Sequence, residues 1–190
     1  MRKCVVLLVA ALAVLSLTLP NQASAQGVFL GAGATIPSGD YGDYADTGWI
    51  AEAGISFPVG EQGFFLFADG LYGSNKHSDY EGDKTNLFGG FAGVEKAFMN
   101  EDGAGLFIFA EVGFLRHSFK SDEYPEDEED DTGLAFGGGA GYGIPLGDSM
   151  SGWVLGRYIR GQYSGDEGYD DWNTSFIGIM AGVSFQLGGS

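Results

Sequence analysis

Apolar and polar residues alternate along most of the chain that follows residue 26. In the segment "SFIGIMAGVSFQLG", Ile177, Ile179 and Val183 share one face, while Gly178 and Gly182 share the other. A period of two with one apolar face is typical of a β-strand. The same pattern predicts eight strands, at 27–36, 48–58, 63–73, 86–98, 105–119, 134–146, 152–163 and 174–187.

The connections between these segments alternate between short and long. Three are short, at 59–63, 99–103 and 146–151, and four are long and acidic, at 37–47, 74–85, 120–133 and 164–173. Outer-membrane barrels have short periplasmic turns and longer outer loops, and their tilted strands need roughly 9–11 residues to cross the bilayer. The sequence therefore predicts an all-β fold, an eight-stranded antiparallel up-and-down transmembrane β-barrel.

The uncharged outer faces distinguish this barrel from a soluble one. A secreted β-sandwich or a lipocalin-like barrel also has alternating strands, but its apolar face points inward and its charges point outward. In "GWIAEAGISFP" the proposed outer face runs from Trp49 through Ile55 to Phe57 without a charge, while Glu52 falls on the inner face. Lipid is therefore the expected solvent of the outer surface.

The first 25 residues predict a secretory signal peptide that is cleaved after Ala25. Two basic residues precede an apolar run that ends at Pro20, and "ASA" precedes the cleavage point. The run is shorter than the roughly 20 residues of a membrane-spanning helix, which argues against an anchor. The predicted barrel domain is 26–190, and cleavage removes Cys4, so no disulfide is expected.

The formal net charge is -17 at pH 7, which argues against nucleic-acid binding because phosphate recognition requires a basic patch. High acidity also favours disorder, but an aromatic content of 14% argues for a folded chain.

Several motifs add a resemblance to a known family. The "ASAQ" junction, "GGGAGYGIPLG", "GRYIRG" and the final "AGVSFQLG" are similar to the small eight-stranded outer-membrane β-barrels of Gram-negative bacteria, such as the OmpA transmembrane domain and OmpX. The resemblance covers 26–190 and implies a monomer in the cell outer membrane. It implies outer-membrane lipid, lipopolysaccharide and the outer-membrane assembly machinery as partners. Assembly signals of this family usually end on an aromatic residue, whereas Phe185 is followed here by five more residues.

Five charged residues are predicted to face the interior of the barrel: Glu52, Asp69, Glu95, Glu111 and Arg157. A narrow barrel fills its interior with side chains, and an unpaired buried charge is costly. We therefore expect the arginine to bridge two or more of the carboxylates. Glu52, Asp69 and Glu111 are expected to share one depth, because each lies at the same spacing from an aromatic residue near the outer rim.

The same charges leave a proton path or narrow pore as an alternative. Four phenylalanines are expected to plug the lumen on the periplasmic side of the charges: Phe65, Phe67, Phe107 and Phe109. Four glycines on one strand are expected to leave room for these rings: Gly137, Gly139, Gly141 and Gly143. This packing favours a structural core over conduction.

No enzyme is predicted. Lipid A deacylases of this barrel size use a His and a Ser two residues apart, together with a carboxylate. Here His117 and Ser118 are adjacent, so they point to opposite faces and cannot act together. His77 lies in a polar loop and is expected to be solvated.

The acidic run "EDEEDD" contains weak candidates for a divalent-cation site: Glu126, Asp127, Glu128, Glu129, Asp130 and Asp131. Calcium binds clustered carboxylates, but a charge run is more often a solvated surface. No cofactor is therefore expected, apart from loosely bound divalent cations.

Two arginines fall on outward positions near the outer rim. Arg116 and Arg160 are candidates for contact with lipopolysaccharide phosphates, and Lys96 has the equivalent place at the opposite rim. Together these features predict a non-enzymatic outer-membrane barrel that stabilises the envelope and displays acidic extracellular loops. A narrow, porin-like ion channel and a surface-binding or adhesion protein are the alternatives.

Overall fold

The computed structural model describes residues 26–60, 63–77, 82–121, 129–164 and 172–187. The predicted signal peptide at 1–25 and parts of the predicted long loops lie outside the described residues. The strands within the described part are β1 (Gln26–Ser38), β2 (Gly48–Val59), β3 (Phe64–Lys76), β4 (Lys84–Met99), β5 (Gly105–Lys120), β6 (Glu129–Pro145), β7 (Met150–Tyr163) and β8 (Trp172–Leu187). A short 3₁₀ helix, η1 (Gly39–Asp43), follows β1.

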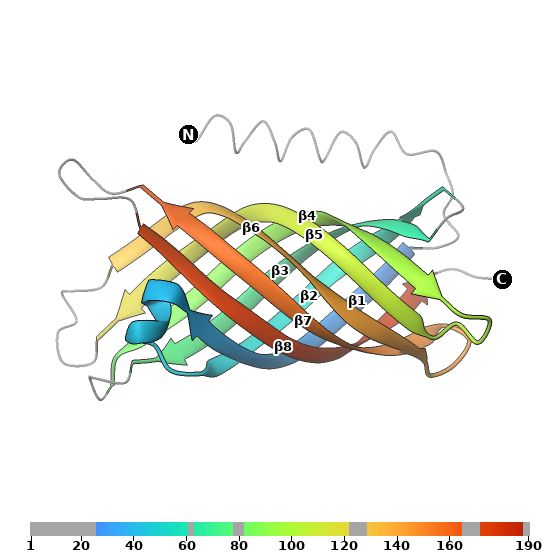
Figure 1. Cartoon of the computed structure of the whole chain (residues 1–190), viewed down its shortest axis with the longest axis horizontal. Helices are drawn as coiled ribbons and strands as arrows, with labels where there is room; N and C mark the ends of the chain where they lie inside the picture. Colours follow the sequence, from blue (N-terminus) through green and yellow to red (C-terminus); the bar gives the residue numbers. More distant parts are fainter. Residues whose placement is uncertain (1–25, 61–62, 78–81, 122–128, 165–171, 188–190) are drawn as a thin grey trace.

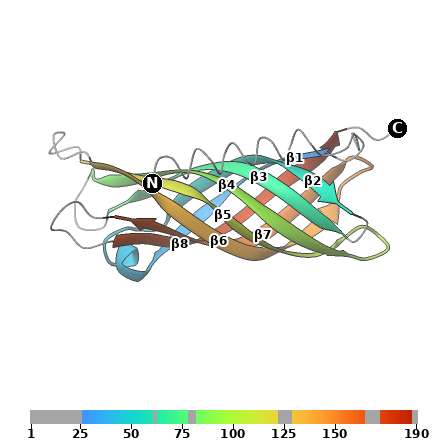
Figure 2. The same ribbon diagram turned by 90° about the horizontal axis from the view of Figure 1, so that it is seen from above.

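The eight strands form one closed barrel (Figure 1). Each strand pairs antiparallel with its neighbour in sequence, and Figure 2 shows the same tilted strands from above. The pairing of β1 with β8 closes the barrel and runs from Gln26 opposite Leu187 to Ser38 opposite Ser175. The predicted fold class, an eight-stranded antiparallel up-and-down β-barrel, is confirmed.

Some strands extend beyond the apolar segments that predicted them. β6 begins at Glu129 rather than at 134, because Asp130 and Asp131 continue its pairing with β5. The apolar pattern marks only the part of a strand that faces lipid, whereas the backbone hydrogen bonds continue past it. The first long connection also contains η1, which its polar sequence did not predict.

The short connections lie together at one end of the barrel, on the right in Figure 1. Two of the three tight reversals use glycines in the left-handed region, with φ of 68° at Gly60, 69° at Gly63 and 77° at Gly103. Side chains with a Cβ rarely adopt this conformation. In outer-membrane barrels the end with short turns is periplasmic, and we assign it so here.

Large apolar side chains cover the outside of the barrel. Leu106, Val154 and Ile179 are each more than half exposed, and many similar residues surround them. An apolar belt on a closed barrel is unfavourable in water and is the expected surface in a bilayer, so this fold is that of a transmembrane β-barrel. No helix in the described part of the chain is long and apolar enough to cross a membrane.

The packed core lies inside the barrel rather than between layers. It is a cluster of buried apolar side chains contributed by seven strands: Ile50, Leu71, Leu87, Phe91, Leu115, Ala135, Ile159, Phe176 and Met180. This cluster is named the apolar layer below.

Candidate functional site in the barrel lumen

Arg157 occupies the centre of the lumen. It lies on β7 opposite Gly139 of β6 and Gly178 of β8, so neither neighbouring position carries a side chain that would block it. Only 2% of Arg157 is exposed. The guanidinium can therefore extend across the barrel toward the opposite strands.

Arg157 donates hydrogen bonds to carboxylates on three other strands. Its Nε donates to Glu111 Oε1 at 2.8 Å, and its Nη2 donates to Glu111 Oε2 at 2.6 Å and to Asp69 Oδ2 at 2.9 Å. Its Nη1 donates to Glu52 Oε2. The guanidinium also lies 5.2 Å from the centroid of the Phe91 ring. One side chain thus joins β2, β3 and β5 to β7 through charged hydrogen bonds; the four residues are named the Arg157 cluster.

The Arg157 cluster holds three carboxylates around one guanidinium. Asp69 Oδ1 is buried and has no hydrogen-bond partner among the described residues. Bringing charges out of water costs several kcal/mol per ion, and direct pairing offsets that cost. The cluster is therefore a buried polar network with an excess of acceptors.

Glu95 faces the lumen but is not part of the Arg157 cluster. It lies further along β4, nearer the short turn, opposite Phe65 of β3 and Phe109 of β5. No hydrogen bond or ion pair joins it to Arg157 within the described part of the chain. Alternation along a strand determined its face correctly, but the depth depends on the stagger between strands.

Most of the apolar layer lies between the Arg157 cluster and the outer end of the barrel, while Phe91 and Met180 flank the cluster itself. Ile50 lies on the outer side of Glu52 along β2, and Leu71 lies on the outer side of Asp69 along β3. Ile50 and Leu71 are at most 1% exposed. Seven strands thus contribute apolar side chains to one buried cluster next to the charges.

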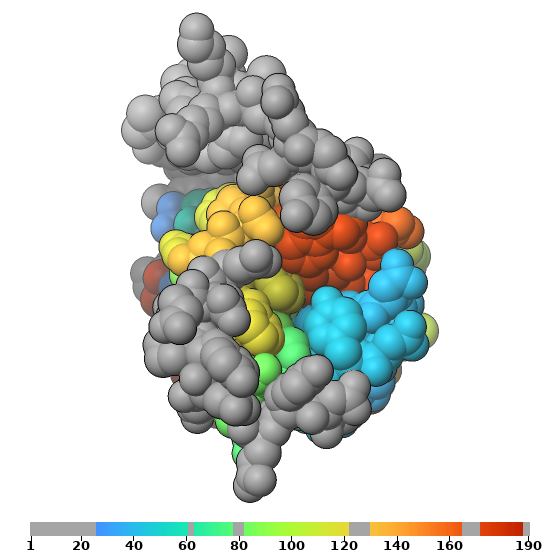
Figure 3. Space-filling view, turned by 90° about the vertical axis from the view of Figure 1, so that its left-hand side faces the viewer, coloured from blue at the N-terminus to red at the C-terminus, as the bar shows by residue number. Residues whose placement is uncertain are grey.

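Aromatic side chains occupy the outer end of the lumen. Tyr41 of η1 is fully buried and its ring contacts His117 edge-on, with centroids 5.9 Å apart. His117 packs edge-on against Trp172 at 5.0 Å, and Trp172 stacks on Tyr163 at 4.1 Å. Figure 3 looks onto this end and shows η1, in cyan, lying over part of it. The polar sequence of 37–47 did not predict this insertion.

His77 is half-buried with specific partners, whereas a solvated side chain was predicted. Its Nε2 is hydrogen-bonded to Thr85 Oγ1 at 2.8 Å, and its ring lies between Tyr44 at 5.3 Å and Phe119 at 5.2 Å. Burial lowers the pKa of His77, against the opposing effect of the Asp83 and Asp46 charges. The loop returns over the histidine because Asp46 N donates to Lys76 O at 2.7 Å.

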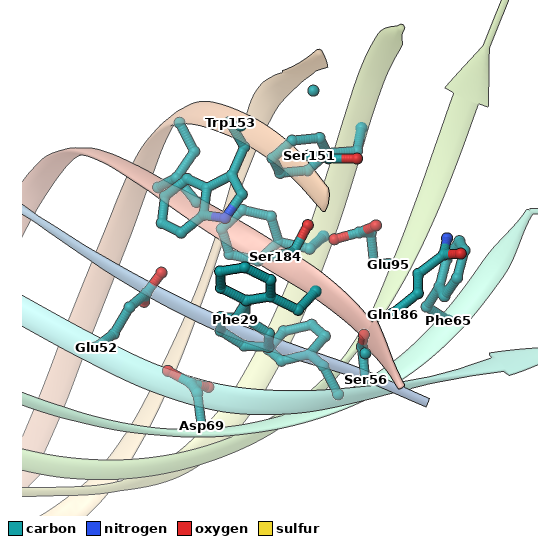
Figure 4. A pocket seen from close by; sticks show the side chains of 18 of the residues that line it. Phe29, Glu52, Ser56, Phe65, Asp69, Glu95, Ser151, Trp153, Ser184 and Gln186 are labelled. Atoms are coloured by element: carbon teal, nitrogen blue, oxygen red, sulfur yellow. The ribbon is translucent and has the colours of Figure 1, made fainter. Parts of the chain in front are cut away.

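A cavity of about 220 Å³ occupies the periplasmic half of the lumen. It extends from the Arg157 cluster to Met99, Gly103 and Gln186 at the short-turn end, and Figure 4 shows the side chains around it. The four predicted phenylalanines line this cavity rather than plug the lumen, as the edge-to-face contact of Phe67 with Phe109 illustrates. Rings held against the wall by such contacts leave the centre open.

The predicted glycines of β6 have different roles. A Cβ at Gly139 would lie 2.8 Å from Cζ of Phe109, and one at Gly141 would overlap the Phe107 ring. A Cβ at Gly137 would instead lie 2.5 Å from Glu111 Oε1, while Gly143 meets no ring. Two of the four glycines thus accommodate phenylalanines, and one accommodates the Arg157 cluster.

The basic residues predicted at the rims differ in their surroundings. Arg116 is exposed and pairs with Asp130 across the β5–β6 ladder, with Nη2 and Oδ2 2.5 Å apart. Arg160 is half-buried on an outward position, and its buried Nε has no partner among the described residues. Lys96 Nζ lies 4.4 Å from the centroid of the outward Phe64 ring.

Half of the predicted acidic cation site falls outside the described residues. This applies to 126–128, and nothing is described for the side chain of Glu129. Asp130 pairs with Arg116, and Asp131 lines a second cavity beside His77 and His117. In the described ranges no group of three or more His, Cys, Asp or Glu residues is placed to hold a metal ion.

Comparisons with known proteins identify the fold. No family model and no curated protein matches the sequence. Among solved structures, Neisserial surface protein A has a TM-score of 0.67 at 15% identity, covering 86% of this chain and 98% of that chain. Ail, the attachment invasion locus protein of Yersinia pestis, has 0.48 at 13% (85% and 99% covered). The N-terminal barrel domain of Pseudomonas aeruginosa OprF has 0.47 at 15% (86% and 98% covered).

The likeness to the Neisserial protein shows a shared fold. With the closed barrel and its apolar outer belt, the chain has the fold of the small eight-stranded outer-membrane β-barrels, as the sequence resemblance implied.

Proposed function

We propose that this chain spans the outer membrane as a closed, internally packed barrel that stabilises the envelope and displays acidic extracellular loops. This proposal rests on the order in which polar and apolar layers follow one another along the lumen. The Arg157 cluster cross-links four strands, and the apolar layer packs beside it with buried side chains from seven strands. Such an interior favours rigidity over transport, because an ion crossing an apolar layer loses its hydration.

The proposed location follows from the apolar belt and from the signal peptide predicted at 1–25, with cleavage after Ala25. Lipopolysaccharide is the proposed partner of Arg160, whose outward position and unpaired Nε suit a phosphate group. The mature chain should partition with outer membranes and migrate differently on gels before and after boiling, because a closed barrel resists detergent unfolding. Recovery as a soluble periplasmic protein without detergent would contradict the proposal.

Planar-bilayer recordings of the refolded chain test the structural role against a narrow channel. The wild type is expected to give no steady conductance. Replacing Ile159 and Phe176 by serine provides a positive control, because these adjacent residues belong to the apolar layer and their loss thins it. Steady wild-type channels that disappear in Arg157→Ala would instead favour the channel.

A further inference from the structure

The cavity in the periplasmic half of the lumen combines aromatic walls with an unpaired carboxylate. Glu95 lines it, and its neighbours across the two adjacent ladders are Phe65 and Phe109. No hydrogen-bond or ion-pair partner of Glu95 occurs within the described residues. Figure 4 shows its carboxylate among the side chains that surround the cavity.

A second acceptor lies at the inner end of the same cavity. Asp69 is 8% exposed and pairs with Arg157 through Oδ2, but its buried Oδ1 has no partner in the part of the chain that the structure describes. The cavity therefore has acceptors at two depths. A buried acceptor without a donor is costly, so a ligand that brings N–H donors gains binding energy here.

The charges around the cavity favour a cation. Four carboxylates line it, at Glu52, Asp69, Glu95 and Glu111, and Arg157 is the one basic residue of the lining. The rings of Phe67, Phe107 and Phe109 add negative π-faces, which attract ammonium groups. An anion of the same shape would be repelled.

Size and shape limit the ligand further. The volume of about 220 Å³ exceeds that of an engineered apolar cavity of about 150 Å³ that holds benzene. The cavity reaches Met99 and Gly103 at the short-turn end, whereas most of the apolar layer lies beyond Arg157 at the other end. Access is therefore from the periplasm, into a pocket that ends inside the barrel.

We propose that this pocket binds a small organic cation from the periplasm, a primary amine with a compact aromatic or aliphatic body. The body packs against the phenylalanine rings, and the ammonium group pairs with Glu95 and lies toward Asp69. This proposal goes beyond the structural role of the barrel and holds whether or not the protein conducts ions.

The test uses phenethylamine as the probe, measured by calorimetry and ligand-observed NMR with the refolded full barrel in detergent micelles. 2-Phenylethanol and phenylacetate serve as the neutral and anionic analogues. Glu95→Gln keeps the shape of the side chain and removes its charge. Glu101→Gln is the matched control, because Glu101 is exposed on the short turn and its change alters net charge equally.

Phenethylamine should bind the wild type and Glu101→Gln equally, and Glu95→Gln should weaken binding on the order of ten-fold or more. Phenylacetate should not bind, and Glu95→Gln should leave the weak binding of 2-phenylethanol unchanged. Heat-modified gel migration verifies that each variant is folded. The proposal would be overturned if phenethylamine associates with the protein-containing micelles no more than with empty micelles. It would also be overturned if Glu95→Gln and the wild type bind phenethylamine with equal affinity. Phenylacetate binding as tightly as the amine would also overturn it.

Discussion

Arg157 and Glu111 are joined by two hydrogen bonds, from Nε to Oε1 at 2.8 Å and from Nη2 to Oε2 at 2.6 Å. This paired geometry orients the plane of the guanidinium. The other edge of the guanidinium donates hydrogen bonds to Glu52 and Asp69 on the opposite wall of the lumen. Glu111 thus orients the Arg157 side chain.

Replacing Arg157 by alanine should destabilise the barrel by about 3–5 kcal/mol, the usual cost of removing one partner from a buried ion pair. Three buried carboxylates would then lie together without a cation. Urea titration in one detergent measures the free energy of unfolding. Arg160→Ala on the same strand is the control, because Arg160 is directed outward. Equal losses in both variants would mean that the cluster contributes little.

Glu111→Gln should be much milder than Arg157→Ala. The amide keeps the shape of the side chain and one acceptor, and it relieves repulsion between Glu111 and the other two carboxylates. The same titration ranks the two variants. A larger loss for Glu111→Gln would show that its paired geometry matters more than neutralisation by the arginine.

Gly137→Ala should destabilise the barrel by about 1–3 kcal/mol, as overpacking usually does. The added Cβ would lie 2.5 Å from Glu111 Oε1 and 2.6 Å from Tyr158 O, so the cluster must shift. Gly156→Ala is the matched control, because no neighbouring atom lies within 4 Å of a Cβ placed at that position. Gly137→Ala should therefore unfold at a clearly lower urea concentration than Gly156→Ala. Equal urea midpoints of the two variants would rule out a packing effect.

The faces of the strands and the shared depth of Glu52, Asp69 and Glu111 could be predicted from the sequence, but the isolation of Glu95 and the loop paths could not. Alternation assigned Glu52, Asp69 and Glu111 to the lumen, because each step along a strand reverses the side chain. It could not predict whether Glu95 reaches Arg157, because the stagger of β4 against its neighbours arises from closing the whole barrel.

The insertion of Tyr41 had no signal in its own segment. Its ring is held by His117, which belongs to a distant strand, so the contact exists only after the barrel has closed. His77 was misjudged for the same reason, since its partners come from three different parts of the chain.

The loop contacts around His77 should weaken as the pH falls below about 6.5, the ordinary pKa of histidine. Burial lowers the pKa of His77, so the open loop takes up a proton before the closed one does. The loss of closed-loop stability should begin near pH 6.5 and level off below the lowered pKa of His77. Above 6.5 the closed loop keeps its full stability.

Amide hydrogen exchange at Asp46 and His77 measures this opening, because their N–H groups donate to Lys76 O and Asp83 O. After correction for intrinsic rates, exchange should be faster at pH 5 than at pH 7.5. His77→Gln should remove most of the difference. Persistence of the pH effect in that variant would assign it to another group, such as His117.

Lipopolysaccharide should stabilise the wild type more than Arg160→Gln, by about 1.5–3 kcal/mol, the range of a hydrogen bond to a charged group. The measurement compares urea midpoints in bilayers with and without lipopolysaccharide. Arg116→Gln should have a smaller effect, because Arg116 already pairs with Asp130. If both variants gain as much stability as the wild type, the proposed phosphate contact is wrong.

The pairing of β1 with β8 has a consequence for how the chain folds. Every other ladder joins strands that follow one another, and each of these can form as a local hairpin. The closing ladder joins residues that are at least 137 positions apart, the separation of Ser38 and Ser175, so it carries the largest loop-closure entropy. Until it forms, two strand edges lie unpaired against lipid, which is strongly unfavourable. Closure should therefore be the slow step of folding, and the barrel should open and close in an all-or-none manner.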